Sequence, residues 1–187
     1  MKKNVISVFC GSGIGKTPIY REAAQELGLL MAQRGKRLMF GGCAAGLMKV
    51  VSDAVRDGGQ TVIAAVIEGI KDPVDLREGD QKVELPTLQD RKRYMIEESD
   101  AMIALPGGMG TLDEISDVYS MIQLRKTQKP LILLNINGFY EPFLALMRHM
   151  NGEGFLNDKY TPMFIVCNTP REALDELEKI DRIVIDD

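Results

Sequence analysis

One stretch decides the fold, Ala101–Glu114, which reads Ala-Met-Ile-Ala-Leu-Pro-Gly-Gly-Met-Gly-Thr-Leu-Asp-Glu. Its first five apolar residues fit a short buried strand, its glycines form a turn, and a helical pattern begins directly after the turn. The first N–H groups of a helix lack partners within the helix, and the helix dipole favours an anion at this end. The stretch therefore predicts a phosphate site.

Nearer the N-terminus, the same order of strand, glycine loop and helix occurs twice more, and a third strand follows. Apolar runs predict strands at Val5–Phe9, Arg37–Phe40 and Thr61–Ile67, and glycine loops follow the first two at Gly11–Lys16 and Gly41–Gly46. Helices are expected at 19–34 and 47–56. This alternation predicts an α/β fold with a parallel sheet covered by helices on both faces. A length of 187 residues, 45% of them hydrophobic, favours a single domain over residues 1–187.

The remaining segments predict further elements and one irregular region. Helices are expected at 87–99, with Thr87 as N-cap, at 139–150 and at 171–180, strands at 131–135 and 164–167, and a final strand or packing tail at 182–185. Residues 68–86 are charged, contain prolines and glycines and lack periodicity. A loop of this length is either a flap beside the site or a plain surface excursion. The single histidine, His149, is expected to be structural or at the surface.

Composition narrows the classes of function. A net charge of -4 disfavours a nucleic-acid or anionic membrane surface, and no apolar run approaches the roughly 20 residues that span a bilayer. The N-terminus lacks the pattern of a signal peptide. Three distant cysteines and one histidine fit neither a zinc site nor a disulfide framework. We expect a cytoplasmic protein without metal or cofactor, nucleic-acid partner or membrane association.

The glycine loops point to a mononucleotide. All follow strands, so they lie at the carboxyl edge of the sheet, where ligands bind in open parallel sheets. The first loop ends in Gly15-Lys16-Thr17, but Cys10 stands where a P-loop has its first glycine. The Gly-x-Gly-x-x-Gly pattern is missing and no acidic residue ends the second strand, which disfavours NAD and FAD. A plain turn remains the alternative for the first loop.

Glu114 is the candidate for chemistry beside the phosphate. It lies three residues after Thr111, on the same side of a helix that we expect to begin near Thr111. A carboxylate is a poor phosphate ligand but suits an oxocarbenium ion or a hydroxyl that needs a base, as in N-glycoside cleavage. The alternative is a helix-dipole role, which we prefer for Asp113. Arg91, in the helix that leads into the strand at 101, is placed to reach the turn, whereas Lys92 and Arg93 fit a solvated face.

Several motifs together resemble one family. Pro106–Glu114 is similar to the Pro-Gly-Gly-x-Gly-Thr-x-x-Glu motif of the LOG (Lonely Guy) proteins, the cytokinin riboside 5′-monophosphate phosphoribohydrolases. The resemblance covers nearly the whole chain and includes Val8–Ser12, Tyr20–Ala24, Gly41-Gly42 with Gly46–Met48, and Arg91-Lys92.

The resemblance implies a Rossmann-like doubly wound sheet, a homodimer or dimer-based assembly, and release of free base and ribose 5-phosphate from a nucleoside 5′-monophosphate. It implies Arg91 and Glu114 as the catalytic pair. The substrate contacts expected alongside them are Ser12, Gly42, Leu88, Lys92, Gly107, Gly108, Met109, Gly110 and Thr111. Leu88, Met95 and Met109 are candidate apolar walls around the base, with core packing as the alternative for Met95.

The chain also departs from the family pattern. Leu88 and Gln89 stand where Met and His are usual, and Asp113, Cys43, Arg125 and Thr127 replace Glu, Gly, Gly and His. These differences bear on the choice of base more than on the reaction. Two alternatives stay open: a nucleosidase for ordinary nucleoside monophosphates such as AMP, and a non-catalytic nucleotide or cofactor carrier. The family is often labelled lysine decarboxylase, but no residue here indicates a Schiff-base lysine.

Overall fold

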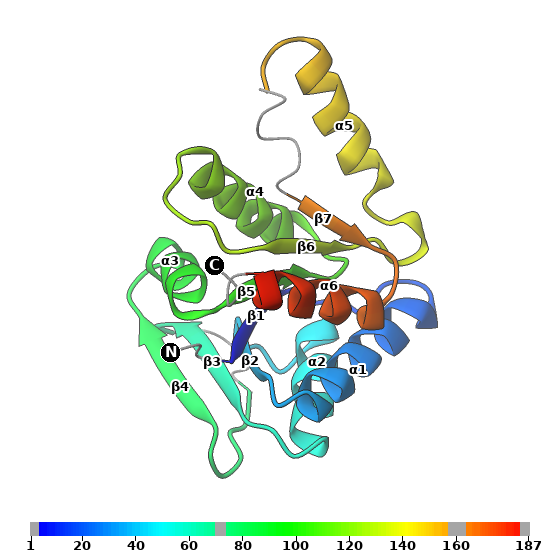
Figure 1. The fold of residues 1–187 in the computed structure, drawn as a ribbon. Coiled ribbons are helices and arrows are strands. Elements are labelled where there is room, and N and C mark those ends of the chain that lie inside the picture. The colour runs from blue at the N-terminus through cyan, green and yellow to red at the C-terminus, as the bar shows by residue number, and fades with distance from the viewer. Residues whose placement is uncertain (1–3, 70–73, 157–163, 184–187) are drawn as a thin grey trace.

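A computed structural model describes residues 4–69, 74–156 and 164–183, and these contain one sheet (Figure 1). Its strands are β1 (Val5–Phe9), β2 (Arg37–Phe40), β3 (Val62–Ile67), β4 (Gln81–Leu85), β5 (Ala101–Ala104), β6 (Leu131–Leu134) and β7 (Phe164–Cys167). The order is β4-β3-β2-β1-β5-β6-β7, and each neighbouring pair is parallel. The strand order reverses beside β1, so β1 and β5 form the switch point of a Rossmann-like sheet.

Helices cover both faces of the sheet. They are α1 (Pro18–Gln33), α2 (Gly46–Asp57), α3 (Leu88–Glu98), α4 (Met109–Gln123), α5 (Glu141–Gly152) and α6 (Pro170–Ile183), with a 3-10 turn η1 at Ile136–Gly138. Alternate residues of each strand point to opposite faces. Ile6 and Val8 pack with α1, α2 and α6, whereas Val5 and Phe9 pack with α3 and α4. The predicted doubly wound parallel α/β fold is confirmed (Figure 1).

The expectation of an irregular loop over residues 68–86 is wrong in its second half. Gln81–Leu85 forms β4, an edge strand that pairs with β3 in the register Ile63↔Gln81 to Ile67↔Leu85. Its alternation of charged and apolar residues suits an edge strand, since charges at an edge oppose pairing with other chains. Before it, the Val74 N–H donates to the Gly42 carbonyl over 2.8 Å. Residues 70–73 lie outside the described residues.

Three helix boundaries also differ from the sequence prediction. The helix expected at 139–150 runs from Glu141 to Gly152 and is preceded by η1, and Pro142 occupies an early α5 position that needs no intrahelical N–H bond. The last helix runs to Ile183 instead of 180, so residues 182 and 183 are helical and not part of the strand expected at 182–185, whose remaining residues lie outside the described part of the chain. The third difference, at α4, belongs to the site. Within the described part of the chain, no helix combines the length and apolarity needed to cross a membrane.

Candidate active site

The three glycine loops meet at the switch point, as predicted. The Gly11 N–H donates to the Pro106 carbonyl over 3.1 Å, which joins the loops after β1 and β5. The Leu47 N–H, at the start of α2, donates to the carbonyls of Gly11 and Gly13 over 3.1 and 3.3 Å. One of the free N–H groups at the N-terminus of α2 is therefore satisfied by the loop after β1, although α2 too follows a glycine loop.

Close contacts between these loops explain two of the glycines. A Cβ on Gly107 would lie 2.1 Å from Thr111 Oγ1 and 2.8 Å from the Gly11 backbone nitrogen. A Cβ on Gly46, whose φ is +58°, would lie 2.2 Å from the Ser12 carbonyl carbon. Any side chain at either position would push the loops apart. These glycines thus serve the packing of loop on loop and not only the approach of a ligand.

A cavity of about 250 Å³ opens at this point. Its walls come from the ends of β1 and β2 and from α2, α3 and α4. The lining residues are Val8, Cys10, Gly11, Ser12, Gly41, Met48, Arg91, Gly108, Met109, Gly110, Thr111 and Glu114. Seven of the eleven predicted site residues line it, Gly11 and Gly41 belong to the loops expected there, and the sequence prediction missed Val8, Cys10 and Met48. Position was the signal for Val8 and Cys10, which lie at the end of β1 and directly after it, whereas Met48 lies in the first turn of α2.

The N-terminus of α4 faces this cavity. The helix begins at Met109, two residues before the expected start near Thr111, because Gly108 is extended and takes the N-cap position. Gly108 brings no capping side chain, and the first turn contains no acidic residue. The electrostatics of the first turn thus favour an anion over a protein partner. Thr111, 4% exposed, forms part of the cavity floor.

Arg91 and Glu114 meet across the cavity. Arg91 Nη2 donates to Glu114 Oε1 over 3.2 Å, and their side chains are 16% and 10% exposed. Thr87 caps α3, accepting the Asp90 N–H through its hydroxyl, and so fixes the turn of α3 that carries Arg91. Arg91 Nε is buried without a partner. The guanidinium is therefore only partly satisfied by protein, which is costly for a buried charged group.

Glu114 titrates near neutrality in this setting. Burial raises its pKa from 4.5 to about 7, and the charge of Asp113 adds to the increase, while Arg91 and Lys92 oppose it. Burial also raises the pKa of the neighbouring Cys10 thiol and Tyr140 phenol well above their usual values. A carboxyl group with a pKa near 7 can both accept and give a proton at neutral pH.

Lys92 lies outside the cavity wall. Its side chain is 4% exposed, and Nζ donates to Asp113 Oδ2 over 2.9 Å and lies 3.2 Å from Asp117 Oδ2. Burial lowers the pKa of Lys92, but the two aspartates outweigh burial and raise it. The solvated-face expectation for Lys92 is therefore wrong, whereas Arg93, with a 73% exposed side chain, matches it. Asp113 is an ion-pair partner, and the helix-start role expected for it is wrong, because α4 begins at Met109 and its first turn contains no acidic residue.

Other predicted residues lie at the rim or elsewhere. Leu88 and Met109 are 51% and 79% exposed, at the starts of α3 and α4. Met95 is fully buried in the core, which is the alternative that the sequence left open for it. Gly42 does not line the cavity; it has a φ of +72° and packs against Val66. Its role as a substrate contact stays a prediction, as does that of Lys92.

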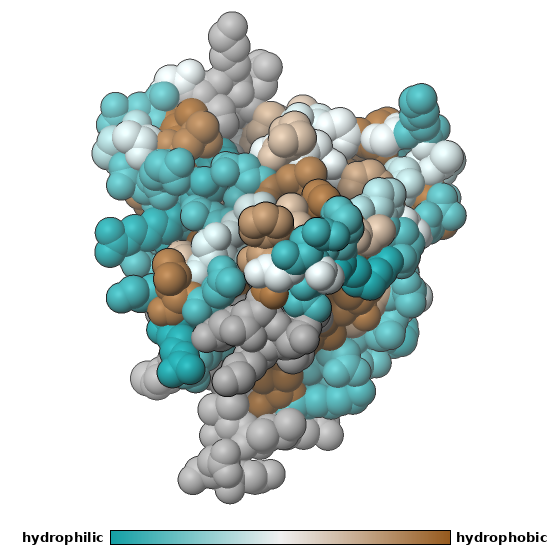
Figure 2. Space-filling model, turned by 90° about the horizontal axis from the view of Figure 1, so that it is seen from above, coloured by the Kyte–Doolittle hydropathy of each residue, from teal (hydrophilic) through white to brown (hydrophobic). Residues whose placement is uncertain are grey.

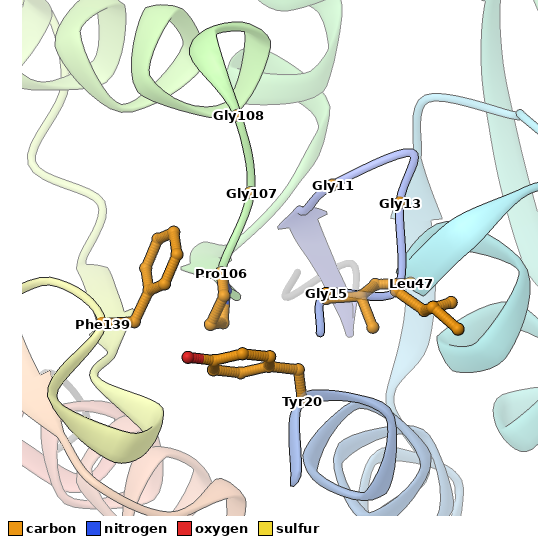
Figure 3. Close-up of a pocket in the computed structure, with 10 residues that line it drawn as sticks. Gly11, Gly13, Gly15, Tyr20, Leu47, Pro106, Gly107, Gly108 and Phe139 are labelled. Carbon is orange, nitrogen blue, oxygen red and sulfur yellow. The ribbon is translucent and has the colours of Figure 1, made fainter. Parts of the chain in front are cut away.

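A second cavity, of about 220 Å³, lies on the other side of the Gly11–Gly107 contact. Figure 3 shows Tyr20 and Phe139 below and beside the glycine backbone of both loops. Their rings meet edge to face with centroids 5.9 Å apart. Apolar and aromatic side chains dominate its walls, and no carboxylate lines it. Of these two cavities, the first is therefore the one with a carboxylate, that of Glu114, in its wall. Among the described residues, no group of three or more His, Cys, Asp or Glu side chains is arranged to hold a metal ion.

Comparison with other proteins assigns the family. A family model described as "Possible lysine decarboxylase" matches residues 48–177. A cytokinin riboside 5′-monophosphate phosphoribohydrolase LOG of Oryza sativa subsp. japonica is 39% identical over 175 residues, which cover 93% of this chain and 72% of the relative. The chain belongs to the LOG family. The LOG resemblance expected from the sequence is thereby confirmed.

Two further matches extend the comparison. A cytokinin riboside 5′-monophosphate phosphoribohydrolase of Arabidopsis thaliana is 39% identical over 177 residues, 93% of this LOG-family chain and 81% of the relative. Among solved structures, the molybdenum cofactor binding protein of Rippkaea orientalis is similar, with a TM-score of 0.71 and 25% identity over 96% of this chain and 98% of that one.

Proposed function

We propose that this LOG-family protein hydrolyses the N-glycosidic bond of nucleoside 5′-monophosphates and releases free base and ribose 5-phosphate. The observation that carries the proposal is the partly satisfied Arg91–Glu114 pair beside the uncapped N-terminus of α4. Relatives with 39% identity are named as enzymes of this class. A buried pair with a perturbed pKa in a cavity fits catalysis better than fold stabilisation.

The 5′-phosphate is placed by the N-terminus of α4. Backbone N–H groups from Gly108 to Thr111 and the helix dipole attract the dianion. Ser12, exposed on the rim of the same cavity, supplies a further hydroxyl. Arg91 contributes a charge-assisted hydrogen bond, since its guanidinium has donors left over after the single contact with Glu114.

Glu114 acts on the ribose. Cleavage of an N-glycosidic bond builds positive charge on the sugar, and an ionised carboxylate beside it stabilises that charge or activates water for attack at C1′. With a pKa of about 7, Glu114 is present in both protonation states at neutral pH. The activity should therefore rise as pH increases through the pKa of Glu114 if the ionised form is the active one.

The proposal also specifies which base the substrate carries. We propose prenylated adenine, as in cytokinin riboside monophosphates, with ordinary bases as the alternative. The exposed side chains of Leu88 and Met109 offer apolar contact to a base at the mouth of the cavity. Rates of base release from isopentenyladenosine monophosphate, AMP, GMP and CMP separate the two substrates. Faster release from the prenylated nucleotide supports the proposal, and equal or slower release favours the ordinary nucleotides.

A non-catalytic carrier is the second candidate, because a structural neighbour is titled a molybdenum cofactor binding protein. A carrier predicts thermal stabilisation by nucleotides without any base release. The enzyme predicts both. Wild-type protein incubated with AMP and isopentenyladenosine monophosphate, with chromatography of the products, decides between them, and nucleotide binding without product would reject the enzyme.

Self-association and a cytoplasmic location complete the proposal. Helix α5 extends from the body of the fold and has no buried residue (Figure 1). Large apolar side chains are exposed at Leu124, Leu146 and Phe155, and Figure 2 shows apolar patches among hydrophilic ones on the face seen from above. We expect a second copy to cover α5 in a homodimer. Light scattering of wild type and Leu146→Glu tests this, and a monomeric wild type contradicts it.

Free Cys10, Cys43 and Cys167 fit a reducing compartment.

A further inference from the structure

A second ion-pair cluster runs parallel to the proposed catalytic pair between α3 and α4. Arg91 and Lys92 are consecutive on α3, and their partners Glu114 and Asp113 are consecutive on α4. The first pair faces the cavity, whereas Lys92 is buried behind it with both oxygens of Asp113 and one of Asp117 within 3.2 Å. The ion pair between Lys92 and Asp113 therefore joins the turn of α3 that carries Arg91 to the turn of α4 that carries Glu114.

Burial makes this cluster more than a surface ion pair. The side chain of Lys92 is 4% exposed, but those of Asp113 and Asp117 are 61% and 37% exposed. The ammonium group of Lys92 is the buried member of the cluster, so losing it would remove the positive charge that ties Asp113 and Asp117 of α4 to α3. Exposed pairs contribute little, and breaking a pair with one buried member costs more.

We infer that Lys92, held by Asp113 and Asp117, is a positioning residue that sets the distance between Arg91 and Glu114 and the charge around Glu114. The inference rests on the proposed function, since it assigns a role to Lys92 in the same reaction. It replaces substrate contact as the role of Lys92, because among the described residues the polar contacts of Nζ are to Asp113 and Asp117 of α4.

Lys92 and Asp113 shift the pKa of Glu114 in opposite directions. From α3, Arg91 and Lys92 lower the pKa of Glu114; from α4, Asp113 raises it; burial raises it further. Cys10 after β1 and Tyr140 before α5 are neutral groups nearby, since burial raises the pKa of each. Lys92→Met should therefore raise the pKa of Glu114, and Asp113→Asn should lower it. A purely structural role for Lys92 predicts no such opposition.

The experiment is a titration of Glu114 by carbon-13 NMR of protein labelled in the glutamate carboxyl groups. The Glu114 signal is the one that disappears in Glu114→Gln. We expect Lys92→Met to raise its pKa and Asp113→Asn to lower it, each by about 0.5 or more. Lys92→Arg keeps the charge and should restore the wild-type value. Arg93→Met is the matched control, because it removes a positive charge from the adjacent, exposed position.

Kinetics supply the second readout. If the protein releases base, Lys92→Met should lower kcat by about 10- to 100-fold through misplacement of Glu114, with little change in KM, because the phosphate turn is untouched. Asp113 is exposed enough that Asp113→Asn should fold even if Lys92→Met does not.

The possible outcomes separate the two proposals. Opposite pKa changes in a protein that releases no base uphold the role of Lys92 in placing Glu114 and reject the enzyme. Base release with an unchanged Glu114 titration in both variants rejects the inference and keeps the enzyme. Equal changes in Arg93→Met and Lys92→Met would also overturn the inference, since they would show a nonspecific charge effect.

Discussion

Two buried arginine–carboxylate pairs in this molecule behave in opposite ways. Arg56 Nε donates to Asp80 Oδ2 over 2.8 Å, and the Asp80 carboxylate also accepts the N–H groups of Val62 and Arg77. Burial would raise the pKa of Asp80, but these hydrogen bonds and the charge of Arg56 lower it. Glu114, equally paired with an arginine, has its pKa raised to about 7.

The difference lies in how completely protein groups satisfy each pair. Asp80 receives backbone donors and its side chain is 1% exposed, so its charge is fully compensated where the segment before β4 packs on α2. Among the described residues, the Glu114 carboxylate accepts one hydrogen bond, from Arg91, whose Nε has no partner. A satisfied pair holds the fold together, whereas a pair left short of partners beside a cavity is open to a ligand.

The largest expected effect is on turnover. Glu114→Gln keeps the shape of the side chain but removes its charge, and should lower kcat by about 10²- to 10⁴-fold. Asp80→Asn removes a charge of equal size from the satisfied pair and should leave kcat near wild type in the folded fraction. Base release at saturating nucleotide, with circular dichroism to confirm folding, measures both. Equal losses in the two variants would erase the distinction between the pairs.

The next effect is on stability, where the Arg56–Asp80 pair should matter more than the Arg91–Glu114 pair. Arg56→Met leaves Asp80 buried and ionised, which should lower the free energy of unfolding by about 3–5 kcal/mol. Arg91→Met should cost less, because Glu114 takes up a proton readily at its raised pKa and Arg91 makes fewer contacts. Urea denaturation followed by circular dichroism tests the order. A larger loss in Arg91→Met contradicts it.

A third effect depends on pH. Because the pKa of Glu114 is higher in the folded protein than its usual 4.5, the folded state binds more protons, and this group favours folding less as pH rises from 4.5 to 7. Gln cannot titrate. The stability of Glu114→Gln relative to wild type should therefore improve over this range by at most about 3 kcal/mol. A difference that stays constant from pH 4.5 to pH 8 would mean that Glu114 has an ordinary pKa.

The smallest effect concerns the helix end beside the reactive pair. Gly110 lies in the first turn of α4 with open space at its Cβ position, so Gly110→Ala should raise stability by up to about 1 kcal/mol. It should also raise KM several-fold, since the methyl group enters the proposed phosphate site. Gly152→Ala, also in a helix with open space, is the control. An unchanged KM in Gly110→Ala would move the phosphate elsewhere.

Sequence patterns predict much of this architecture, for physical reasons. Continuous apolar runs such as Leu131–Leu134 indicate buried parallel strands, and glycine loops after strands place the site at the carboxyl edge. The sequence did not predict the edge strand β4, because its mixture of charged and apolar residues is found both in loops and in exposed strands. The ion pairs of Lys92 were not predicted, because the spacing of residues within one helix does not show which helix packs opposite it. The aromatic cavity joins Tyr20 and Phe139, which are far apart in the chain.

The most direct test of the central claim is the product balance of wild-type protein with a nucleoside 5′-monophosphate. The account predicts free base and ribose 5-phosphate in equal amounts, with no release from the corresponding nucleoside, because the 5′-phosphate anchors the substrate at α4. Glu114→Gln should form neither product while remaining folded. Unchanged product formation in Glu114→Gln, or a folded wild type that binds the nucleotide and releases nothing, would contradict the account.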